Sequence, residues 1–256
     1  MPALELWLHP LDSPLSDTLR ASLLGLLPAR ERARHAAFRH EGAADEFLCG
    51  RAMLRGLRSA DAPVDPRAWA MGENRYGRPW IVGPPVGPLR WGNVSHTRGM
   101  VAVLLSDIEP AGVDVERVTR RVSPREVAHR YFSASEREAL LALDDEGARG
   151  RFFDLWTLKE AFIKAKGMGL AIPLGDFSFE LAREAVEVRF APALDERSER
   201  WWFHRFDPTS EHRVALAARS DGAPVSLSVR RLDDLRPLSQ GNPRVAVDAA
   251  RVLSTP

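Results

Sequence analysis

The chain has 256 residues and a formal net charge of +1 at pH 7, so its overall charge does not indicate a partner such as nucleic acid. Its length is sufficient for one large domain or two small ones. The single cysteine, Cys49, excludes an internal disulfide and a zinc site built from several cysteines. Because no apolar run reaches membrane-spanning length and no basic-then-apolar leader is evident, we expect a cytoplasmic protein that binds neither nucleic acid nor membrane.

The N-terminal part of the sequence predicts one strand followed by three helices. A short apolar run places the strand at residues 4–8, and leucines at helical spacing place the first helix at residues 12–27. An arginine-rich helix follows, and the third helix is expected at about residues 43–57. This helix contains Cys49, whose apolar neighbours in the sequence favour a buried structural thiol over a nucleophile.

The next segment predicts two pairs of strands. The first pair, around residues 69–82, encloses the Gly-Arg-Pro-Trp motif at residues 77–80. The second pair lies within residues 90–105 and is joined by a turn that contains Ser95 and His96. A histidine at a turn is usually only a polar surface residue, but a hydroxyl, an imidazole and turn N–H groups together can bind an anion.

Two acidic residues share one side of a predicted strand at residues 112–117. Val113 and Val115 alternate with Asp114 and Glu116, and residues two apart on a strand face the same side. Two carboxylates this close repel each other, which raises a pKa unless a cation lies between them. The pattern fits either a solvated strand edge or a divalent metal site, for which Mg²⁺ is favoured because it binds carboxylate and phosphate oxygens.

A long helix is predicted within the stretch of residues 152–170, where a broad apolar stripe recurs at helical spacing. Gly167 provides the permissive backbone that a helix C-terminus favours. Glu160 and Lys164 are four residues apart and therefore share a face. Such a pair is usually solvated and worth a few tenths of a kcal/mol, but Trp156 flanks the same side and favours a half-buried pair.

The remaining signals divide the chain into three parts. Capping signals at Ser123 and Ser133 predict two helices, and five short strands are expected between residues 177 and 229. A Pro-containing link at residues 106–111 marks a seam between two halves. We therefore expect an N-terminal subdomain, a C-terminal subdomain and a tail without an assigned function, at residues 1–108, 109–232 and 233–256.

The acidic strand and the long helix resemble the paired signatures of the Sfp-type phosphopantetheinyl transferases. The strand, GVDVER, resembles their apolar-Gly-apolar-Asp-apolar-Glu motif, and WTLKEAFIKAKG from Trp156 to Gly167 resembles their W-x-x-K-E-x-x-x-K helix. NVSHT at residues 93–97 and GRPW at residues 77–80 resemble two further elements of these enzymes. The four weak patterns occur in family order over roughly residues 26–180, which makes the combined resemblance strong.

The resemblance implies an α/β (α+β) fold. Two similar, pseudo-twofold-related subdomains are expected, each a small, mostly antiparallel sheet packed with helices, with the active site at their junction. The implied reaction transfers the 4'-phosphopantetheine arm of coenzyme A to a serine of an acyl or peptidyl carrier protein and releases adenosine 3',5'-bisphosphate. The expected form is a monomeric enzyme that serves secondary metabolite biosynthesis.

The resemblance also implies roles for individual residues. Asp114, Glu116 and Glu160 are expected to bind Mg²⁺, with Mn²⁺ as a possible substitute. Lys164 is expected to pair with the pyrophosphate, and Glu160 to serve as ligand, as the base for the serine proton, or as both; the catalytic residues are then Glu160, Lys164 and Asp114. Lys159, on another face, is expected to be structural or to face the nucleotide. The residues expected to hold coenzyme A are Arg51, Arg78, Ser95 and His96, together with Lys164.

Two other functions are compatible with the same residues. Three carboxylates could serve another Mg²⁺-dependent phosphoester hydrolase, such as a phosphatase or nuclease. A non-catalytic module that binds coenzyme A is the second alternative, although complete acidic and Lys-Glu motifs argue against it. For the transferase, the helices at residues 123–143 are the candidate surface for the carrier protein, with the side chains of Arg125, Arg130, Tyr131 and Phe132 exposed or half-exposed. The alternative is that these side chains pack inward or are merely solvated.

Overall fold

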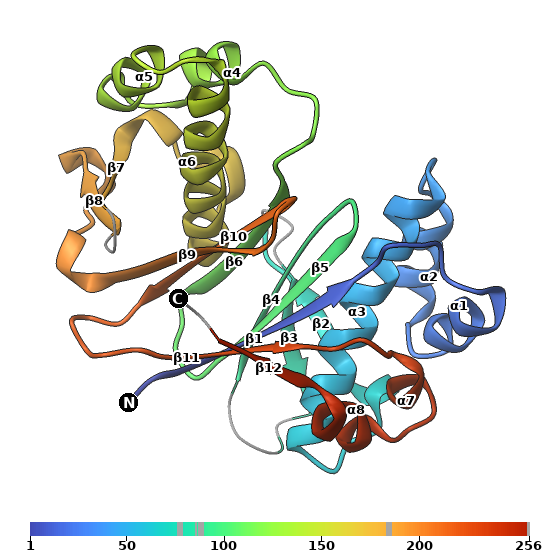
Figure 1. The fold of residues 1–256 in the computed structure, drawn as a ribbon. Coiled ribbons are helices and arrows are strands. Elements are labelled where there is room, and N and C mark those ends of the chain that lie inside the picture. Colours follow the sequence, from blue (N-terminus) through green and yellow to red (C-terminus); the bar gives the residue numbers. More distant parts are fainter. Residues whose placement is uncertain (76–78, 85, 87–89, 183–185, 255–256) are drawn as a thin grey trace. The chain divides into compact units, whose positions relative to one another are not determined.

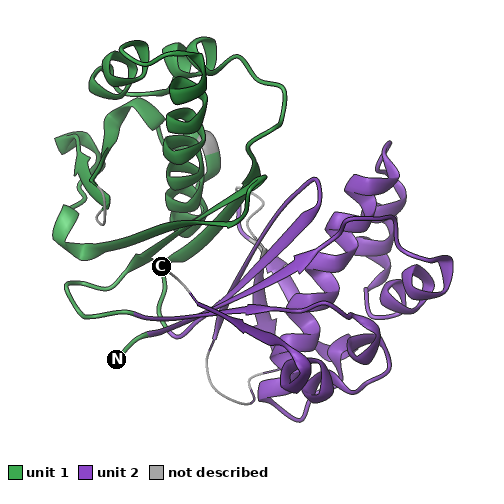
Figure 2. Cartoon of the chain, in the orientation of Figure 1, with its two compact units in different colours: residues 1–2, 108–225 green, residues 3–107, 226–256 purple. Residues whose placement is uncertain are grey.

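The computed structural model describes residues 1–75, 79–84, 86, 90–182 and 186–254 (Figure 1). The chain divides into two compact units, each of which draws on separate stretches of sequence (Figure 2). Residues 3–107 with 226–256 form what we call the N-terminal unit, and residues 1–2 with 108–225 form the central unit.

The N-terminal unit is built on a five-stranded sheet with the order β12-β11-β1-β5-β4. These strands are β1 (Ala3–Pro10), β4 (Trp91–Thr97), β5 (Met100–Ser106), β11 (Ser226–Arg231) and β12 (Arg251–Leu253). The pairings are antiparallel apart from that of β1 with β11, which run parallel with Leu6 opposite Val229. A separate antiparallel pair is formed by β2 (Ala70–Glu73) and β3 (Pro79–Gly83).

One long helix, α3 (Glu41–Asp61), packs on β4 and β5 and contributes more residues to this unit's core than any other element. The other elements of the unit are α1 (Asp17–Leu24), α2 (Ala29–Ala36), α7 (Arg236–Ser239), α8 (Pro243–Ala249) and a 3₁₀ turn at Pro66–Ala68. Buried Asp45 fixes α1 to α3, because its carboxylate accepts hydrogen bonds from Arg20 Nε (2.9 Å) and Leu15 N (3.0 Å). Cys49 lies in the core, where burial raises the pKa of its thiol to about 12, so the expectation of a structural thiol is confirmed.

The central unit has the same plan of one long helix on a mostly antiparallel sheet. Its helix α6 (Asp145–Lys166) packs on the sheet β6-β10-β9, as Figure 1 shows. The strands are β6 (Ala111–Arg117), β9 (Trp201–Thr209) and β10 (His212–Arg219), with a separate pair β7 (Phe177–Leu181) and β8 (Val186–Phe190). Shorter elements are α4 (Pro124–Tyr131), α5 (Ala134–Leu141) and 3₁₀ turns at Gly169–Ala171, Leu174–Asp176, Pro192–Leu194 and Ser198–Arg200.

Local signals fix both ends of α6. Asp144 caps the helix by accepting a hydrogen bond from Gly147 N at 2.8 Å, and Gly167 ends it with a φ of 65°, as the sequence predicts. The helix therefore begins at Asp145, earlier than the expected start at Phe152. At α5, the capping box of Ser133 and Glu136 is confirmed.

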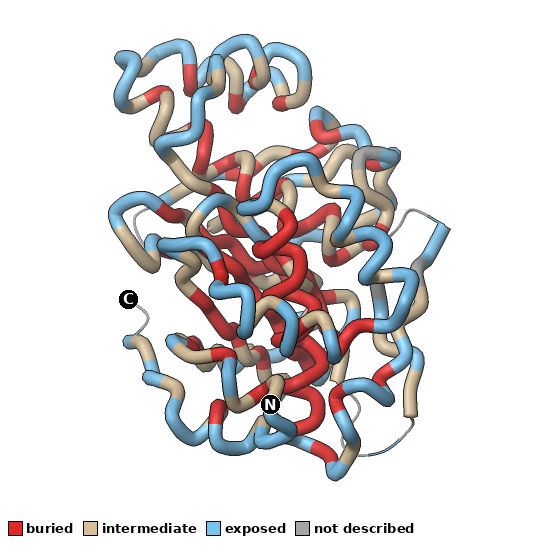
Figure 3. The backbone as a smooth tube through the Cα atoms, turned by 90° about the vertical axis from the view of Figure 1, so that its right-hand side faces the viewer, coloured by how far each residue is buried: buried red, intermediate tan, exposed pale blue. Residues whose placement is uncertain are grey.

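The buried residues lie mainly in the sheets and in the two long helices. Stretches of α3, α6, β5 and β6 are buried, whereas α2 is mostly exposed and α4 about half exposed. Figure 3 shows the buried stretches along the inside of the chain and the exposed ones at its surface. The expected α/β class, with small, mostly antiparallel sheets packed with helices, is confirmed. Within the part of the chain that the structure describes, no helix has both the length and the hydrophobicity needed to cross a membrane.

The C-terminal stretch lies differently from the expected boundaries. Residues 226–232 were expected in the C-terminal subdomain, but β11 pairs with β1 of the N-terminal unit. Residues 233–256 were expected to form a separate tail, but α7 and α8 pack on α3, and Leu238 lies against Gly56. Pairing between strands more than two hundred residues apart leaves no local pattern, so the sequence did not reveal it.

Gly112 allows β6 to contact the backbone of α6 directly. A Cβ at this position would lie 2.4 Å from both Ala161 O and Ala165 N. Gly112→Ala is therefore expected to lower the free energy of unfolding by about 1–3 kcal/mol, because strand and helix must separate. Urea denaturation measures this loss.

The matched control is Gly150→Ala in the same unit. A Cβ at Gly150 meets no atom within 4 Å, and alanine favours a helix over glycine by about 0.5–1 kcal/mol. The control is thus expected to be neutral or slightly stabilising. Equal effects of the two substitutions would contradict the close approach at Gly112.

Candidate active site

Two carboxylates of β6 face the long helix of the central unit. Gly112 lies against α6, and Asp114 and Glu116 follow at two-residue intervals on the same side of the strand. Asp114 Oδ1 accepts a hydrogen bond from Lys164 Nζ at 2.6 Å, and Glu116 Oε1 accepts one from Trp156 Nε1 at 2.9 Å. The acidic strand is therefore not a solvated edge, since both carboxylates are buried.

Helix α6 contributes Trp156, Glu160 and Lys164 at four-residue intervals, so all three share one face. Glu160 and Lys164 are half-buried, as the sequence predicts. The charge of Asp114 acts on Glu160 as well as on Glu116, so the three expected acidic residues lie within electrostatic reach of one another. We call Asp114, Glu116, Glu160 and Lys164 the acidic cluster.

The acidic cluster carries more negative charge than its own cations offset. Burial and then the charge of Asp114 raise the pKa of Glu116 to about 7, and the same two causes raise the pKa of Glu160 to about 7. Arg120, whose Nη2 lies 3.3 Å from Glu116 Oε1, and Lys164 oppose these shifts without cancelling them. An added cation would therefore be stabilised here.

The acidic cluster is expected to make the protein lose stability as the pH rises from about 4.5 to about 7. In the folded chain Glu116 and Glu160 have pKa values of about 7, against 4.5 for the unconstrained carboxyl. Within this window the folded state retains protons that the unfolded state has released, so its stability falls with increasing pH. A Glu116→Gln variant should show a shallower fall, measured by urea denaturation across the window. The same slope in both proteins would contradict the raised pKa of Glu116.

The donor chemistry of the acidic cluster fits a hard divalent cation. Carboxylate oxygens are the donors that Mg²⁺ and Mn²⁺ prefer, and the uncompensated negative charge favours such an ion. Among the residues that the structure describes, no group of three or more His, Cys, Asp or Glu side chains is already gathered into a metal-binding arrangement. Binding would therefore require side chains of the acidic cluster to move.

Lys159 is structural, one of the two roles expected for it. Its fully buried Nζ donates to Leu174 O (2.7 Å) and Phe177 O (2.6 Å) and lies 2.9 Å from Glu136 Oε2. These contacts tie α6 to α5 and to the start of β7. Burial lowers the pKa of the Lys159 ammonium to about 8.

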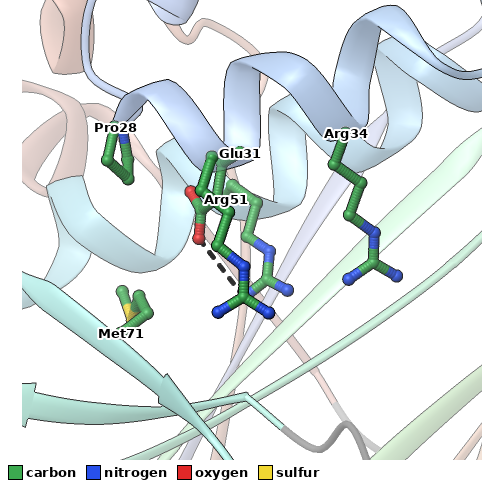
Figure 4. A pocket seen from close by; sticks show the side chains of 6 residues that line it. Pro28, Glu31, Arg34, Arg51 and Met71 are labelled. Carbon is green, nitrogen blue, oxygen red and sulfur yellow. Dashed lines mark ion pairs between the residues drawn. The ribbon is translucent and has the colours of Figure 1, made fainter.

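Arg51, on α3 of the N-terminal unit, lines a pocket between α2 and β2. The residues that line it are Pro28, Arg30, Glu31, Arg34, Arg51 and Met71. The guanidinium groups of Arg34 and Arg51 extend toward the same side, and Arg51 Nη1 lies 3.9 Å from Glu31 Oε1 (Figure 4). Three arginines around one acidic residue make this pocket a candidate anion site. Arg78, another expected ligand of coenzyme A, lies outside the described residues.

Ser95 and His96 lie in β4 rather than in a turn. The strand continues to Thr97, because Ser95 and His96 pair with Ala102 and Val101 of β5. Successive strand residues face opposite sides, so Ser95 is buried while His96 is exposed. His96 Nδ1 lies 3.2 Å from Glu46 Oε2 of α3, which orients its ring.

The surface at α4 and α5 differs in part from the expectation. Phe132 is buried and stacks on Phe152 at a centroid distance of 5.6 Å, so inward packing is the alternative that holds for this residue. Tyr131 is half-buried, and Arg125 forms an ion pair with Asp145 at 2.5 Å. Arg130 is exposed.

The structure adds residues that the sequence did not single out. Arg120 and Glu46 contact expected site residues, and Glu31 and Arg34 line the pocket beside Arg51. The spacing of four residues between Glu116 and Arg120 did not predict their contact, because that contact depends on the path of the chain after β6. The arginine-rich composition of α2 was the available signal for Arg34.

Comparison with known proteins identifies relatives of similar length. A family model described as the 4'-phosphopantetheinyl transferase superfamily matches residues 110–217, which include the acidic cluster. The 4'-phosphopantetheinyl transferase Sfp of Bacillus subtilis (strain 168) is 27% identical over 225 residues, covering 88% of this chain and 96% of that protein. A protein named putative 4'-phosphopantetheinyl transferase from Synechocystis sp. is 30% identical over 171 residues, covering 67% of this chain and 68% of its own.

A solved structure is also similar. The holo-[acyl-carrier-protein] synthase of Thermotoga maritima matches 42% of this chain and 60% of its own, with 26% sequence identity and a TM-score of 0.33.

Proposed function

The chain belongs to the 4'-phosphopantetheinyl transferase superfamily, and from this membership we propose that it transfers the 4'-phosphopantetheine arm of coenzyme A to a serine of an acyl or peptidyl carrier protein. The serine oxygen forms a bond to phosphorus, the pyrophosphate P–O bond breaks, and adenosine 3',5'-bisphosphate leaves. The observation that carries the proposal is the acidic cluster, where carboxylates and a lysine from two motifs of the sequence meet.

Asp114, Glu116 and Glu160 would hold the divalent cation, Mg²⁺ or Mn²⁺. When bound, the ion would act as a Lewis acid toward the pyrophosphate oxygens. Trp156 positions Glu116 by donating to Oε1, and the Gly112 contact holds β6 beside α6. These contacts fix the backbone from which the ligands extend.

Glu160 and Lys164 would move and balance charge during transfer. Glu160, whose pKa is raised to about 7 in the metal-free chain, would accept the serine proton directly or through water. The Lys164 ammonium, one helical turn away, would neutralise charge that develops on the departing phosphate. Both residues extend from one rigid helix, which favours a fixed geometry.

The arginine pocket and β4 of the N-terminal unit would bind the adenosine end of coenzyme A. Arg51 and Arg34 supply guanidinium groups suited to phosphate, and exposed His96 supplies an imidazole. Ser95 and Arg78 keep their expected roles as parts of the same proposal. Phosphate contacts of this kind act in substrate binding rather than in the chemical step.

Arg51→Met is therefore expected to raise the KM for coenzyme A about tenfold and to change kcat little. Steady-state kinetics at saturating carrier protein measures both constants. The matched control is Arg67→Met, in which an exposed arginine of the same unit is replaced, and both constants should stay within about twofold. A lower kcat with an unchanged KM would contradict a binding role for Arg51.

The protein partner is a carrier domain, for which exposed Arg130 and Leu141 provide a basic and apolar surface near α4 and α5. The carrier class is not specified by these residues. Secondary metabolite biosynthesis, a monomeric state and a cytoplasmic location stay predictions.

Mass spectrometry of an apo carrier protein tests the proposal. The purified chain is incubated with coenzyme A, MgCl₂ and the carrier, and the carrier should gain the mass of the phosphopantetheine arm at its serine. Cleavage of coenzyme A without carrier modification would instead favour a phosphoester hydrolase. Binding of coenzyme A with neither reaction, across a panel of carriers, would favour a non-catalytic module.

A further inference from the structure

The Lys164 side chain bridges from α6 to the buried carboxylate of Asp114. The Nζ–Oδ1 distance is 2.6 Å, the Asp114 side chain is 5% exposed, and that of Lys164 is 29% exposed. The ion pair therefore has one fixed partner, the aspartate within β6, and one partner that reaches the surface.

A divalent cation held by Asp114 would share this carboxylate with the Lys164 ammonium. The two positive charges repel each other, and both seek the oxygens of one buried carboxylate. The cation and Lys164 therefore bind Asp114 less favourably together than either does alone, although the other carboxylates of the acidic cluster attract both. Binding of one weakens binding of the other.

We propose that Lys164 and the divalent cation compete for Asp114, so that metal binding displaces the ammonium from Asp114 and frees it for the substrate phosphate. The inference rests on the proposed function, because it assigns the metal to Asp114. It adds an order of events, since Lys164 becomes free to meet the phosphate only when the metal is bound. Metal binding would then make both the cation and the Lys164 ammonium available to the substrate phosphate.

The side chain of Lys164 can make this movement. Its four-carbon stem is flexible, and its exposed fraction leaves a path away from β6. The residue lies in the last turn of α6, where the helix dipole stabilises a positive charge. Displacement therefore needs no change of backbone.

Mn²⁺ binding without coenzyme A provides a direct test. Wild type and Lys164→Met are titrated with Mn²⁺ by calorimetry, and free Mn²⁺ is followed by electron paramagnetic resonance. Competition predicts a dissociation constant at least about fivefold lower for Lys164→Met, because the competing charge is gone. Circular dichroism verifies that the variant is folded.

Lys166→Met is the matched control. It removes the same charge from the same helix, but Lys166 pairs with Glu196, outside the acidic cluster. Its Mn²⁺ affinity should stay within about twofold of wild type, since remote charges are screened. Equal gains in both variants would show a general charge effect and would overturn the competition.

Three further results separate the inference from the proposed function. If Lys164→Met binds Mn²⁺ no more tightly than wild type, the competition is overturned. The metal site still stands in that case, provided that Mn²⁺ binding by the wild type depends on Asp114. Binding that persists unchanged in Asp114→Asn would remove the metal site and the competition together, as would no binding by any protein. In a crystal structure of the wild type with Mn²⁺, Lys164 Nζ should lie beyond hydrogen-bond distance of Asp114; retention of the contact beside the ion would also overturn the proposal.

Discussion

Asp114→Asn is expected to lower the rate of phosphopantetheine transfer at least about 100-fold. Lewis-acid stabilisation by a metal ion is worth several kcal/mol in a phosphoryl transition state, and each 1.4 kcal/mol corresponds to about tenfold in rate. The substitution removes the carboxylate charge whose field acts on both Glu116 and Glu160, while it keeps the size of the side chain. Transfer to a carrier protein, followed by mass spectrometry over time, measures the loss.

Asp207→Asn is the matched control for this loss. Asp207 lies on β9 of the same sheet, pairs with Arg213 at 2.8 Å and has a half-exposed side chain. The same chemical change there should leave the rate within about twofold, because it touches no residue of the acidic cluster. Transfer by Asp114→Asn at the wild-type rate would refute the metal assignment.

Glu160→Gln distinguishes the two roles considered for this residue. Glutamine keeps an oxygen donor but cannot accept the serine proton. A slow variant with wild-type Mn²⁺ affinity would identify Glu160 as the base, whereas loss of both rate and affinity would identify it as a ligand. Wild-type rate and affinity together would exclude both roles.

The acidic cluster was predictable from the sequence because it depends on short periodicities. A spacing of two places Asp114 and Glu116 on one side of β6, and spacings of four place Glu160 and Lys164 on one side of α6. Gly112 then brings these two sides into contact. Neither periodicity predicts that the strand and the helix meet. That expectation came from the resemblance to a known family.

The features that the sequence missed depend on contacts between distant residues. Lys164 pairs across to Asp114, which was not evident from the Glu160 to Lys164 spacing. Ser95 and His96 were expected in the turn between two strand-like runs, yet strand pairing uses the backbone and tolerates polar side chains. The turn needs only the residues around Gly99, whose φ of 88° suits glycine.

The burial of the Lys159 charge is not evident from the sequence pattern around it. Lys159 stands next to Glu160 on an amphipathic helix, a position where a lysine is commonly solvated. In the fold it is fully buried, with Phe177 at 4.2 Å from Nζ to the ring centroid. The segments that enclose it lie outside its own helix, so composition and spacing within the helix could not reveal them.

Lys159→Met is expected to lower the free energy of unfolding by about 3–5 kcal/mol. Removal of one partner from a buried ion pair leaves the other charge without compensation, which costs far more than the pair itself contributes. The remaining Glu136 carboxylate would retain only hydrogen bonds such as that from Phe179 N at 3.0 Å. Urea denaturation at neutral pH measures the change.

Two further variants show that the loss comes from the buried charge. Lys159→Met combined with Glu136→Gln should recover part of the stability, because the carboxylate charge is then absent. Arg189→Met removes an exposed partner of Glu180, with side chains 70% and 55% exposed, and should cost no more than about 1 kcal/mol. A cost for Lys159→Met as small as that of Arg189→Met would mean that the Lys159 ammonium does not stabilise the packing of α6 against α5 and β7.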